Sequence, residues 1–208
     1  MRRRMSFYEK QILPRLLDLS MRQERLAAYR RQVTSVASGT VLEIGIGSGL
    51  NLPIYGLDVD RVYGVDPSAE LLKFAQEKTK NLRFPVLLLR ASAECLPLKD
   101  HSIDTVVTTW TLCSIPDALE ALREMRRVLR LEGRLLFAEH GLSPEPMIES
   151  WQNWLTPCWK RIGGGCHLNR KMDDLIRAAG FHLDQLETGY MKGPKPMTFM
   201  YQGQARRE

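Results

Sequence analysis

VLEIGIGSG, residues 41–49, is the stretch on which the interpretation of the whole chain depends. Its apolar start predicts a strand, and glycines at every second position, Gly45, Gly47 and Gly49, predict a tight turn. A ligand can lie directly against such a turn because no Cβ intervenes. The dinucleotide fingerprint needs its third small residue three positions after the second, where this chain has Leu50. The spacing therefore predicts a nucleotide ligand other than NAD.

Strands and helices are expected to alternate after this turn. The apolar runs predict strands at 41–44, 61–65, 85–89, 105–109, 134–139, 181–187 and 198–205, and helices at 69–78, 116–130 and 171–179. Near-continuous apolar strands separated by helices are typical of a parallel sheet that is covered on both faces. We therefore predict an α/β fold with a doubly wound, mostly parallel, seven-stranded sheet.

Two further segments are expected to lie outside this repeating pattern. Residues 1–37 predict an N-terminal helical lid, helical from residue 7 and kinked or broken at Pro14. Residues 142–170, rich in tryptophan, proline and glycine, predict a cap inserted into the main domain, which spans 38–208. These two segments are the candidates for covering a site.

The basic residues of the chain are concentrated at its start. The formal net charge is +6, and residues 1–31 alone hold nine Lys or Arg against three Glu or Asp. A solvated helical face is the favoured interpretation, although weak contact with a membrane surface through this segment stays open. Nucleic acid is not the expected partner, and the oligomeric state is left open.

Cysteine usage and hydropathy favour a cytoplasmic protein. The four cysteines, Cys95, Cys113, Cys158 and Cys166, form no CxxC pair and no metal-ligand spacing, so reduced thiols and no metal site are expected. No stretch is long and apolar enough to span a bilayer, and no signal peptide is recognised.

Asp66 is the first polar residue after the second predicted strand. It follows Gly49 by 17 residues. A carboxylate at such a strand end can accept hydrogen bonds from both hydroxyls of a ribose. The structural alternative is that Asp66 caps the following helix, a role that Ser68 would also fill.

Four motifs in this order resemble those of the class I S-adenosylmethionine-dependent methyltransferases. They are VLEIGIGSG, VYGVDPS, ASAECLPLKDHSIDTVV and LREMRRVLRLEGRLLF. The resemblance implies S-adenosyl-L-methionine as cofactor, held at the carboxyl ends of the first four strands. The cofactor-binding positions that it implies are Glu43, Gly45, Gly47, Gly49, Asn51, Asp66, Pro67, Ser92, Ala93, Glu94 and Thr109, and Tyr8 is added from the entry helix. Ser92 stands where relatives commonly have an acid, which predicts a weaker acceptor for the adenine amino group.

A narrower resemblance covers the second half of the chain. TLCSIPD, FAEHG and WQNWLTPCWKRIGGGCHLNR are similar to the methyltransferase-like alkyl-thiol methyltransferases, of the methyltransferase type 11 group. This resemblance implies a small, apolar acceptor, with a thiol favoured.

Candidates for catalysis and for acceptor binding lie in this second half. His140, just after the fifth strand, is the candidate general base, against the alternative of a histidine that only bonds backbone. Trp151, Trp154, Cys166 and His167 are candidate substrate residues, and the tryptophans are also candidates for the core of the cap.

Other functions stay open at this point. The acceptor can instead be a lipid head group, an amine, a phenol or nucleic acid, and a cofactor-binding protein without catalysis is a further alternative. Against nucleic acid, the fourth strand ends in Thr108-Thr-Trp-Thr111 and lacks the tetrad with which amino-methylating DNA enzymes hold a flipped base.

Overall fold

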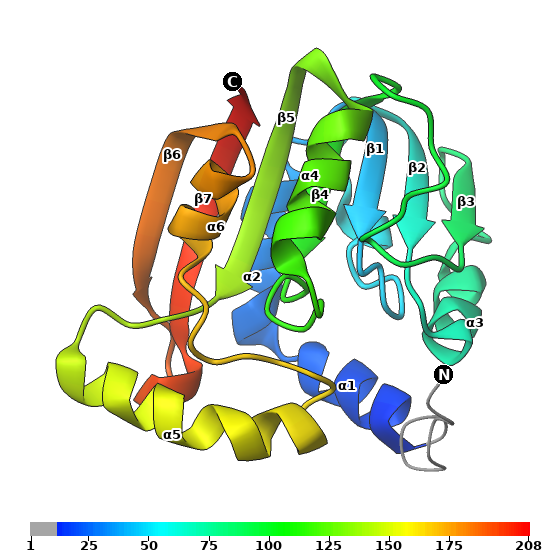
Figure 1. The fold of residues 1–208 in the computed structure, drawn as a ribbon. Coiled ribbons are helices and arrows are strands. Elements are labelled where there is room, and N and C mark those ends of the chain that lie inside the picture. Colours follow the sequence, from blue (N-terminus) through cyan, green and yellow to red (C-terminus); the bar gives the residue numbers. More distant parts are fainter. Residues whose placement is uncertain (1–11) are drawn as a thin grey trace, which may run out of the picture.

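The computed structural model describes residues 12–208, which form one seven-stranded sheet with helices on both faces (Figure 1). The strand order is β3-β2-β1-β4-β5-β7-β6. The first five strands are parallel, and β7 is antiparallel to both β5 and β6. The strands are β1 (Gly39–Ile44), β2 (Val59–Val65), β3 (Val86–Leu89), β4 (Ile103–Thr109), β5 (Leu129–His140), β6 (Phe181–Tyr190) and β7 (Phe199–Arg207). The predicted doubly wound, mostly parallel fold is confirmed.

The central strands are apolar on both faces because both faces are covered. In β4, Val106 packs into one core cluster and Val107 into the other, and Leu135 and Leu136 of β5 divide in the same way. Successive side chains of a strand point to opposite faces, so a strand buried on both sides needs a continuous apolar run. This requirement is the physical reason why the strands could be recognised in the sequence.

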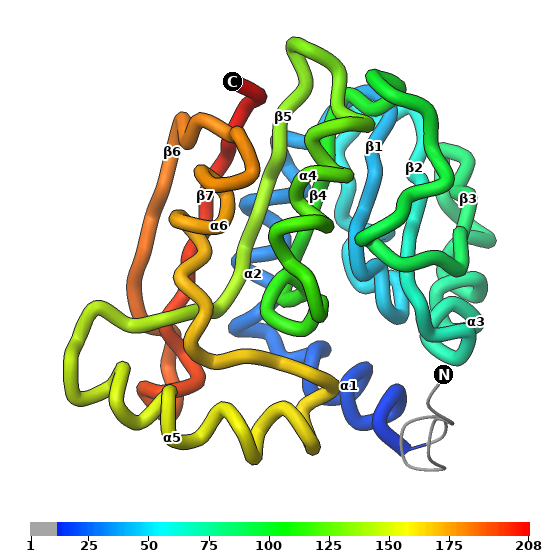
Figure 2. Tube along the Cα trace, in the orientation of Figure 1, coloured from blue at the N-terminus to red at the C-terminus, as the bar shows by residue number. Residues whose placement is uncertain are grey.

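Helices α4 and α6 cover one face, and α2 covers the other. The helices are α1 (Leu13–Met21), α2 (Glu24–Thr34), α3 (Ala69–Lys78), α4 (Ala118–Val128), α5 (Pro146–Ile162) and α6 (Met172–Ala178), with short 3₁₀ helices η2 (Leu52–Ile54) and η3 (Lys195–Met197). Leu122 and Met125 of α4 are fully buried in the first cluster, whereas Val33 of α2 and Leu72 of α3 pack in the second. The sheet thus has a layer of helix on each side, as Figure 2 also shows.

The entry segment is divided differently from the prediction. Pro14 does not kink a longer helix; it occupies the first turn of α1, where its missing N–H has no helical partner to lose. The break falls instead at Gln23, whose ψ of 136° is extended and which precedes α2. The predicted break at Pro14 was therefore wrong within the described residues.

The predicted cap is mostly one helix, α5, which crosses the lower edge of the sheet in Figure 1 together with α1. The arrowheads of the parallel strands point toward this edge. No helix within residues 12–208 has the length and hydropathy needed to cross a membrane.

Candidate active site

A cavity of about 430 Å³ opens at the carboxyl ends of β1, β2 and β4. These strands flank the point where the strand order reverses, which is where doubly wound sheets bind ligands. The lining combines the glycine turn, the ends of these strands and residues from α1, α2 and the segment after α5. Of the predicted cofactor residues, it includes Glu43, Gly45, Gly47, Asn51, Asp66, Pro67, Ser92, Ala93 and Thr109.

The three glycines of the turn differ in what surrounds them. All three have positive φ, between 55° and 76°, a region that other residues rarely adopt. A Cβ on Gly45 would lie 2.2 Å from Thr111 Oγ1, and one on Gly49 would lie 3.1 Å from the backbone of Ala75 in α3. A Cβ on Gly47 would meet nothing closer than 3.8 Å. Gly45 and Gly47 therefore bring bare backbone to the cavity, whereas Gly49 lies off the lining and permits close packing of α3.

Glu43 is fully buried at the floor of the cavity and held by two donors. Tyr55 Oη donates to Glu43 Oε2 at 2.8 Å, and Asn51 Nδ2 donates to Glu43 Oε1 at 2.9 Å. Burial raises the pKa of Glu43 to about 7, although these hydrogen bonds and nearby Arg30 oppose the rise. Asn51 Oδ1 is buried and has no hydrogen-bond partner within residues 12–208. The pair therefore offers a carboxylate and a free amide oxygen to a ligand that donates hydrogen bonds, such as an ammonium group.

Asp66, at the end of β2, is buried and braces the glycine turn. Its Oδ2 accepts from Gly47 N at 3.0 Å and its Oδ1 accepts from Ser68 N at 2.8 Å. The N-cap of α3 is Ser68, whose hydroxyl accepts from Leu71 N. Burial raises the pKa of Asp66 against the effect of these two hydrogen bonds. Capping of α3 therefore does not require Asp66, and its role in ribose binding stays a prediction.

The segment after β3 contributes Ser92 and Ala93 but not Glu94. Ser92 Oγ donates to Glu94 Oε2 at 2.7 Å, and Glu94 Oε1 accepts from Asp117 N at the start of α4. Glu94 thus lies outside the lining and connects Ser92 to α4.

Several cavity residues were not identified from the sequence, among them Arg30 of α2 and Trp110. Arg30 is 5% exposed, and its guanidinium lies 5.0 Å from the centroid of the Trp110 ring. Burial lowers the pKa of Arg30, and Glu43 opposes that shift. Trp110 has a φ of 50°, which is unusual for a residue with a side chain and marks a strained turn beside the cavity. The prediction of a solvated basic face was wrong for Arg30, which is buried. The sequence pattern does not distinguish Arg30 from its exposed neighbour Arg31.

The cavity is covered by two segments far apart in the sequence. Leu13, Leu17 and Met21 of α1 line it from one side, and Gly163 and Gly164 after α5 line it from another. Figure 1 shows the two elements converging below the sheet.

Helix α1 is fixed to the glycine turn by a hydrogen bond from Ser48 Oγ to Asp18 Oδ1. Tyr8, the predicted contact from the entry segment, lies outside the described residues.

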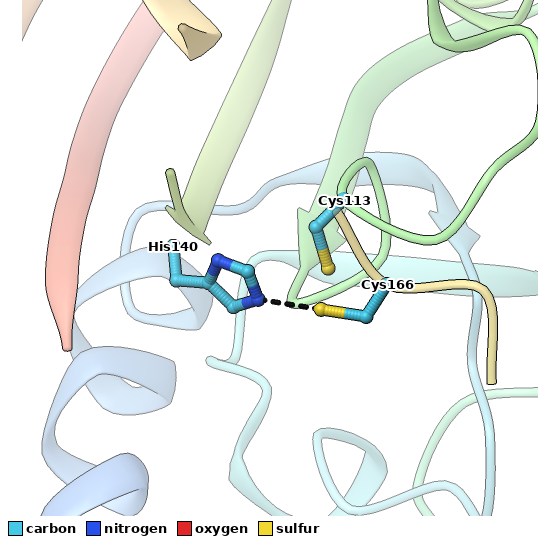
Figure 3. Close-up of side chains that lie close together, drawn as sticks. All are labelled: Cys113, His140 and Cys166. Atoms are coloured by element: carbon cyan, nitrogen blue, oxygen red, sulfur yellow. Dashed lines mark hydrogen bonds between the residues drawn. The ribbon is translucent and has the colours of Figure 1, made fainter. Parts of the chain in front are cut away.

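His140 does not line the cavity. Its Nε2 lies 2.8 Å from Cys166 Sγ, next to Cys113, and all three residues are buried or nearly so (Figure 3). The hydrogen bond with Cys166 lowers the pKa of the Cys113 thiol, and the same contact together with burial raises that of Cys166. Burial alone would lower the pKa of His140, but charge on Cys113 raises it. The placement gives no support to His140 as a base in contact with the acceptor.

The remaining predicted substrate residues also lie outside the lining. His167 Nδ1 faces the carbonyl oxygen of Cys113 at 3.1 Å, and burial lowers its pKa. Trp151 and Trp154 form an edge-to-face pair on the outer side of α5 and are 51% and 71% exposed. They form neither the core of the cap nor an aromatic wall of this cavity, because the helical spacing that predicted them does not say which side of α5 faces inward.

Comparison with known proteins agrees with this geometry. Residues 42–137 match a methyltransferase domain model. The thiol S-methyltransferase TMT1B of Rattus norvegicus is 36% identical over 152 residues, which cover 71% of this chain and 62% of the relative. TMT1B of Homo sapiens is 34% identical over 170 residues, which cover 79% and 68%. The chain thus spans about two thirds of the length of these relatives.

A solved structure from Thermotoga maritima has the same fold. It is described as an S-adenosylmethionine-dependent methyltransferase, possibly a histamine N-methyltransferase. It superposes with a TM-score of 0.68 at 22% identity, covering 95% of this chain and 99% of its own.

Proposed function

The chain belongs to the class I S-adenosylmethionine-dependent methyltransferases, and we propose that it methylates the sulfur of a small, apolar thiol. When bound, S-adenosylmethionine supplies a methyl group on a sulfonium sulfur. In the transfer, a bond forms between the thiolate sulfur and the methyl carbon as the sulfonium bond breaks, and the products are a methyl thioether and S-adenosylhomocysteine. The thiol proton leaves to solvent before the transfer.

The polar residues of the cavity fit the cofactor in complementary ways. Glu43 and the free oxygen of Asn51 would receive its ammonium group, and Arg30 would face its carboxylate. Asp66 would hold the ribose hydroxyls from the end of β2, while Ser92 and Ala93 would border the adenine. The unpartnered Asn51 oxygen is the observation that most directly calls for a ligand here, since buried polar atoms are rarely left without a partner.

The proposal of a thiol acceptor is supported by the lack of a histidine in the described cavity wall, where the carboxylates of Glu43 and Asp66 are assigned to the cofactor. No histidine is among the described residues that line it. Helix α1 contributes the apolar side chains of Leu13, Leu17 and Met21 beside Asp18, whose carboxylate bonds Ser48 and Arg22. A thiol forms its thiolate near neutral pH, whereas an amine or phenol depends more on a positioned base. Two relatives named thiol S-methyltransferases support the same acceptor class.

We further propose that α1 and Gly163–Gly164 act together as the lid of this site, which follows the predicted roles of residues 1–37 and 142–170. In-line displacement needs alignment of nucleophile and methyl group and exclusion of water. The contact between Asp18 and Ser48 would couple lid position to the cofactor turn.

Calorimetric titration with S-adenosylmethionine tests the cofactor assignment. Saturable binding at one site per chain is expected, and the product S-adenosylhomocysteine should compete. Lack of saturable binding at millimolar cofactor would reject the assignment.

A screen for formation of S-adenosylhomocysteine then tests the acceptor. The panel should contain alkyl thiols of increasing length, sulfide, phenols, primary amines, a phosphatidylethanolamine vesicle and RNA. Turnover of apolar thiols that exceeds that of matched alcohols and amines is expected. Turnover confined to amines, phenols, lipid or RNA would replace the thiol proposal, and cofactor binding without turnover of any acceptor would favour the non-catalytic alternative.

A further inference from the structure

Three side chains from distant parts of the sequence meet beside the cavity. Cys113 lies between β4 and α4, His140 ends β5, and Cys166 follows α5. Their ligand atoms, two Sγ and one histidine ring nitrogen, all lie within 4.8 Å of one another. Figure 3 shows the imidazole and both sulfurs directed toward a common centre. Cys113 and Cys166 are 2% and 7% exposed, so this arrangement is enclosed by protein.

We propose that Cys113, His140 and Cys166 form a zinc site with three protein ligands and a fourth position for an exogenous ligand such as water. The linear spacing of the cysteines had predicted no metal site, because each ligand comes from a separate element. The folded chain overturns the premise of that prediction by bringing the donors together.

The separations suit tetrahedral zinc. With Zn–S near 2.3 Å and Zn–N near 2.0–2.1 Å, two sulfurs stand about 3.8 Å apart and a sulfur and a nitrogen about 3.6 Å apart. The three atoms lie within 4.8 Å of one another, so shifts of about 1 Å would bring them to these separations. The 2.8 Å contact between His140 Nε2 and Cys166 Sγ is a hydrogen bond. A metal that replaces the proton between them would require these two atoms to move apart by about 0.8 Å.

The donor set selects zinc over hard cations. Thiolates and imidazole prefer soft or borderline metals, whereas Mg²⁺ and Ca²⁺ require oxygen ligands. Two thiolates and a neutral imidazole balance the charge of Zn²⁺, which is important in a buried position because an uncompensated charge there is costly.

Polar neighbours are in place to orient the sulfurs. Ser114 Oγ lies 3.5 Å from Cys113 Sγ, and the Trp159 indole is a polar neighbour of Cys166. Such outer groups commonly fix the ligands of a metal and tune their basicity. Ser114 also lines the cavity, so a bound metal would fix the wall of the site as well as join three elements.

Metal titration of the reduced protein tests the proposal independently of methyl transfer. The full chain is stripped with a chelator under argon with a phosphine reductant, then titrated with Zn²⁺ against a chromophoric competitor and with Co²⁺ by absorption. We expect one zinc per chain, a submicromolar dissociation constant, and the ligand-field and thiolate charge-transfer bands of tetrahedral Co²⁺.

Variants separate this site from the other thiols. Cys113→Ser, Cys166→Ser and His140→Gln should each weaken zinc binding by about a hundredfold or more, since each removes one ligand. The matched controls are Cys95→Ser and Cys158→Ser, which alter exposed cysteines and should bind like the wild type. Circular dichroism and thermal unfolding of every variant show whether it is folded.

Two results would overturn the proposal without any variant. The first is that the reduced wild-type protein takes up no stoichiometric Zn²⁺ or Co²⁺. Cys113, His140 and Cys166 would then be a hydrogen-bonded cluster that binds no metal. The other is a Cys113–Cys166 disulfide, found as a loss of two hydrogens in intact mass, in protein purified with the reductant.

Discussion

Asp66 Oδ2 accepts a hydrogen bond from Gly47 N at 3.0 Å, so the end of β2 is joined to the middle of the glycine turn that follows β1. Two motifs 19 residues apart thereby become one surface of the cavity. A ligand that contacts one of them is in reach of the other.

Replacing Asp66 with Asn should weaken cofactor binding by about tenfold or more, since hydrogen bonds to a charged group contribute about 1.5–3 kcal/mol. Calorimetric titration measures the change. The control is Asp60→Asn, an exposed carboxylate on the same strand, which should bind the cofactor normally. Equal affinity of the two variants would remove Asp66 from the cofactor site.

Arg30→Met should lower cofactor affinity by about tenfold or more, because it removes the buried cation proposed to face the cofactor carboxylate. Methionine keeps much of the apolar stem that packs against Trp110. Arg31→Met is the matched control, since Arg31 is exposed and pairs only with exposed Glu24 among its described ion pairs. The same titration decides, and a parallel loss in both variants would contradict a specific role for Arg30.

Glu43 should make the unbound protein less stable as pH rises. Burial raises its pKa from 4.5 to about 7, so the folded state binds this proton more tightly than the unfolded state does. The free energy of unfolding should therefore fall between about pH 4.5 and 7, by up to about 3 kcal/mol. Urea unfolding of wild type and Glu43→Gln at pH 5 and pH 8 measures this effect. The variant should lose less stability across this interval, and equal losses would contradict the raised pKa.

Alanine substitutions should separate the two glycines that line the cavity. Gly47→Ala should cost about 1 kcal/mol of stability for its positive φ, because its Cβ has open space. The same Cβ would protrude into the ligand space, so cofactor affinity should fall sharply. Gly45→Ala should cost about 2–4 kcal/mol, since φ strain and the clash with Thr111 add. Urea unfolding and calorimetry test both, and equal destabilisation would contradict the packing difference.

Local patterns predicted the parts of the molecule that local physics determines. Continuous apolar strands, the glycine turn and Asp66 follow from short-range rules, and the helix predicted at 69–78 coincides with α3 (Ala69–Lys78). For the same reason, most of the cofactor-binding residues that the family motifs implied do line the cavity. Their roles in binding stay predictions.

The other features depend on which side of a helix faces the cavity and on long-range contacts. Arg30 and Arg31 are neighbours of the same type, yet one is buried over Trp110 and the other is exposed. Cys113, His140 and Cys166 come within 4.8 Å only because β4, β5 and the segment after α5 converge. The spacing of these residues in the sequence therefore could not predict that they lie together.

The position of β7 has a consequence for how the protein is made. β7 follows β6 in the chain but lies between β5 and β6, and it pairs with both. During synthesis, β6 therefore emerges from the ribosome with no partner strand, and the outer edge of β5 stays open until Phe199–Arg207 has been added. An open strand edge is a template for pairing with other chains. Nascent chains that stall before β7 should consequently be the species most exposed to aggregation and most dependent on chaperones.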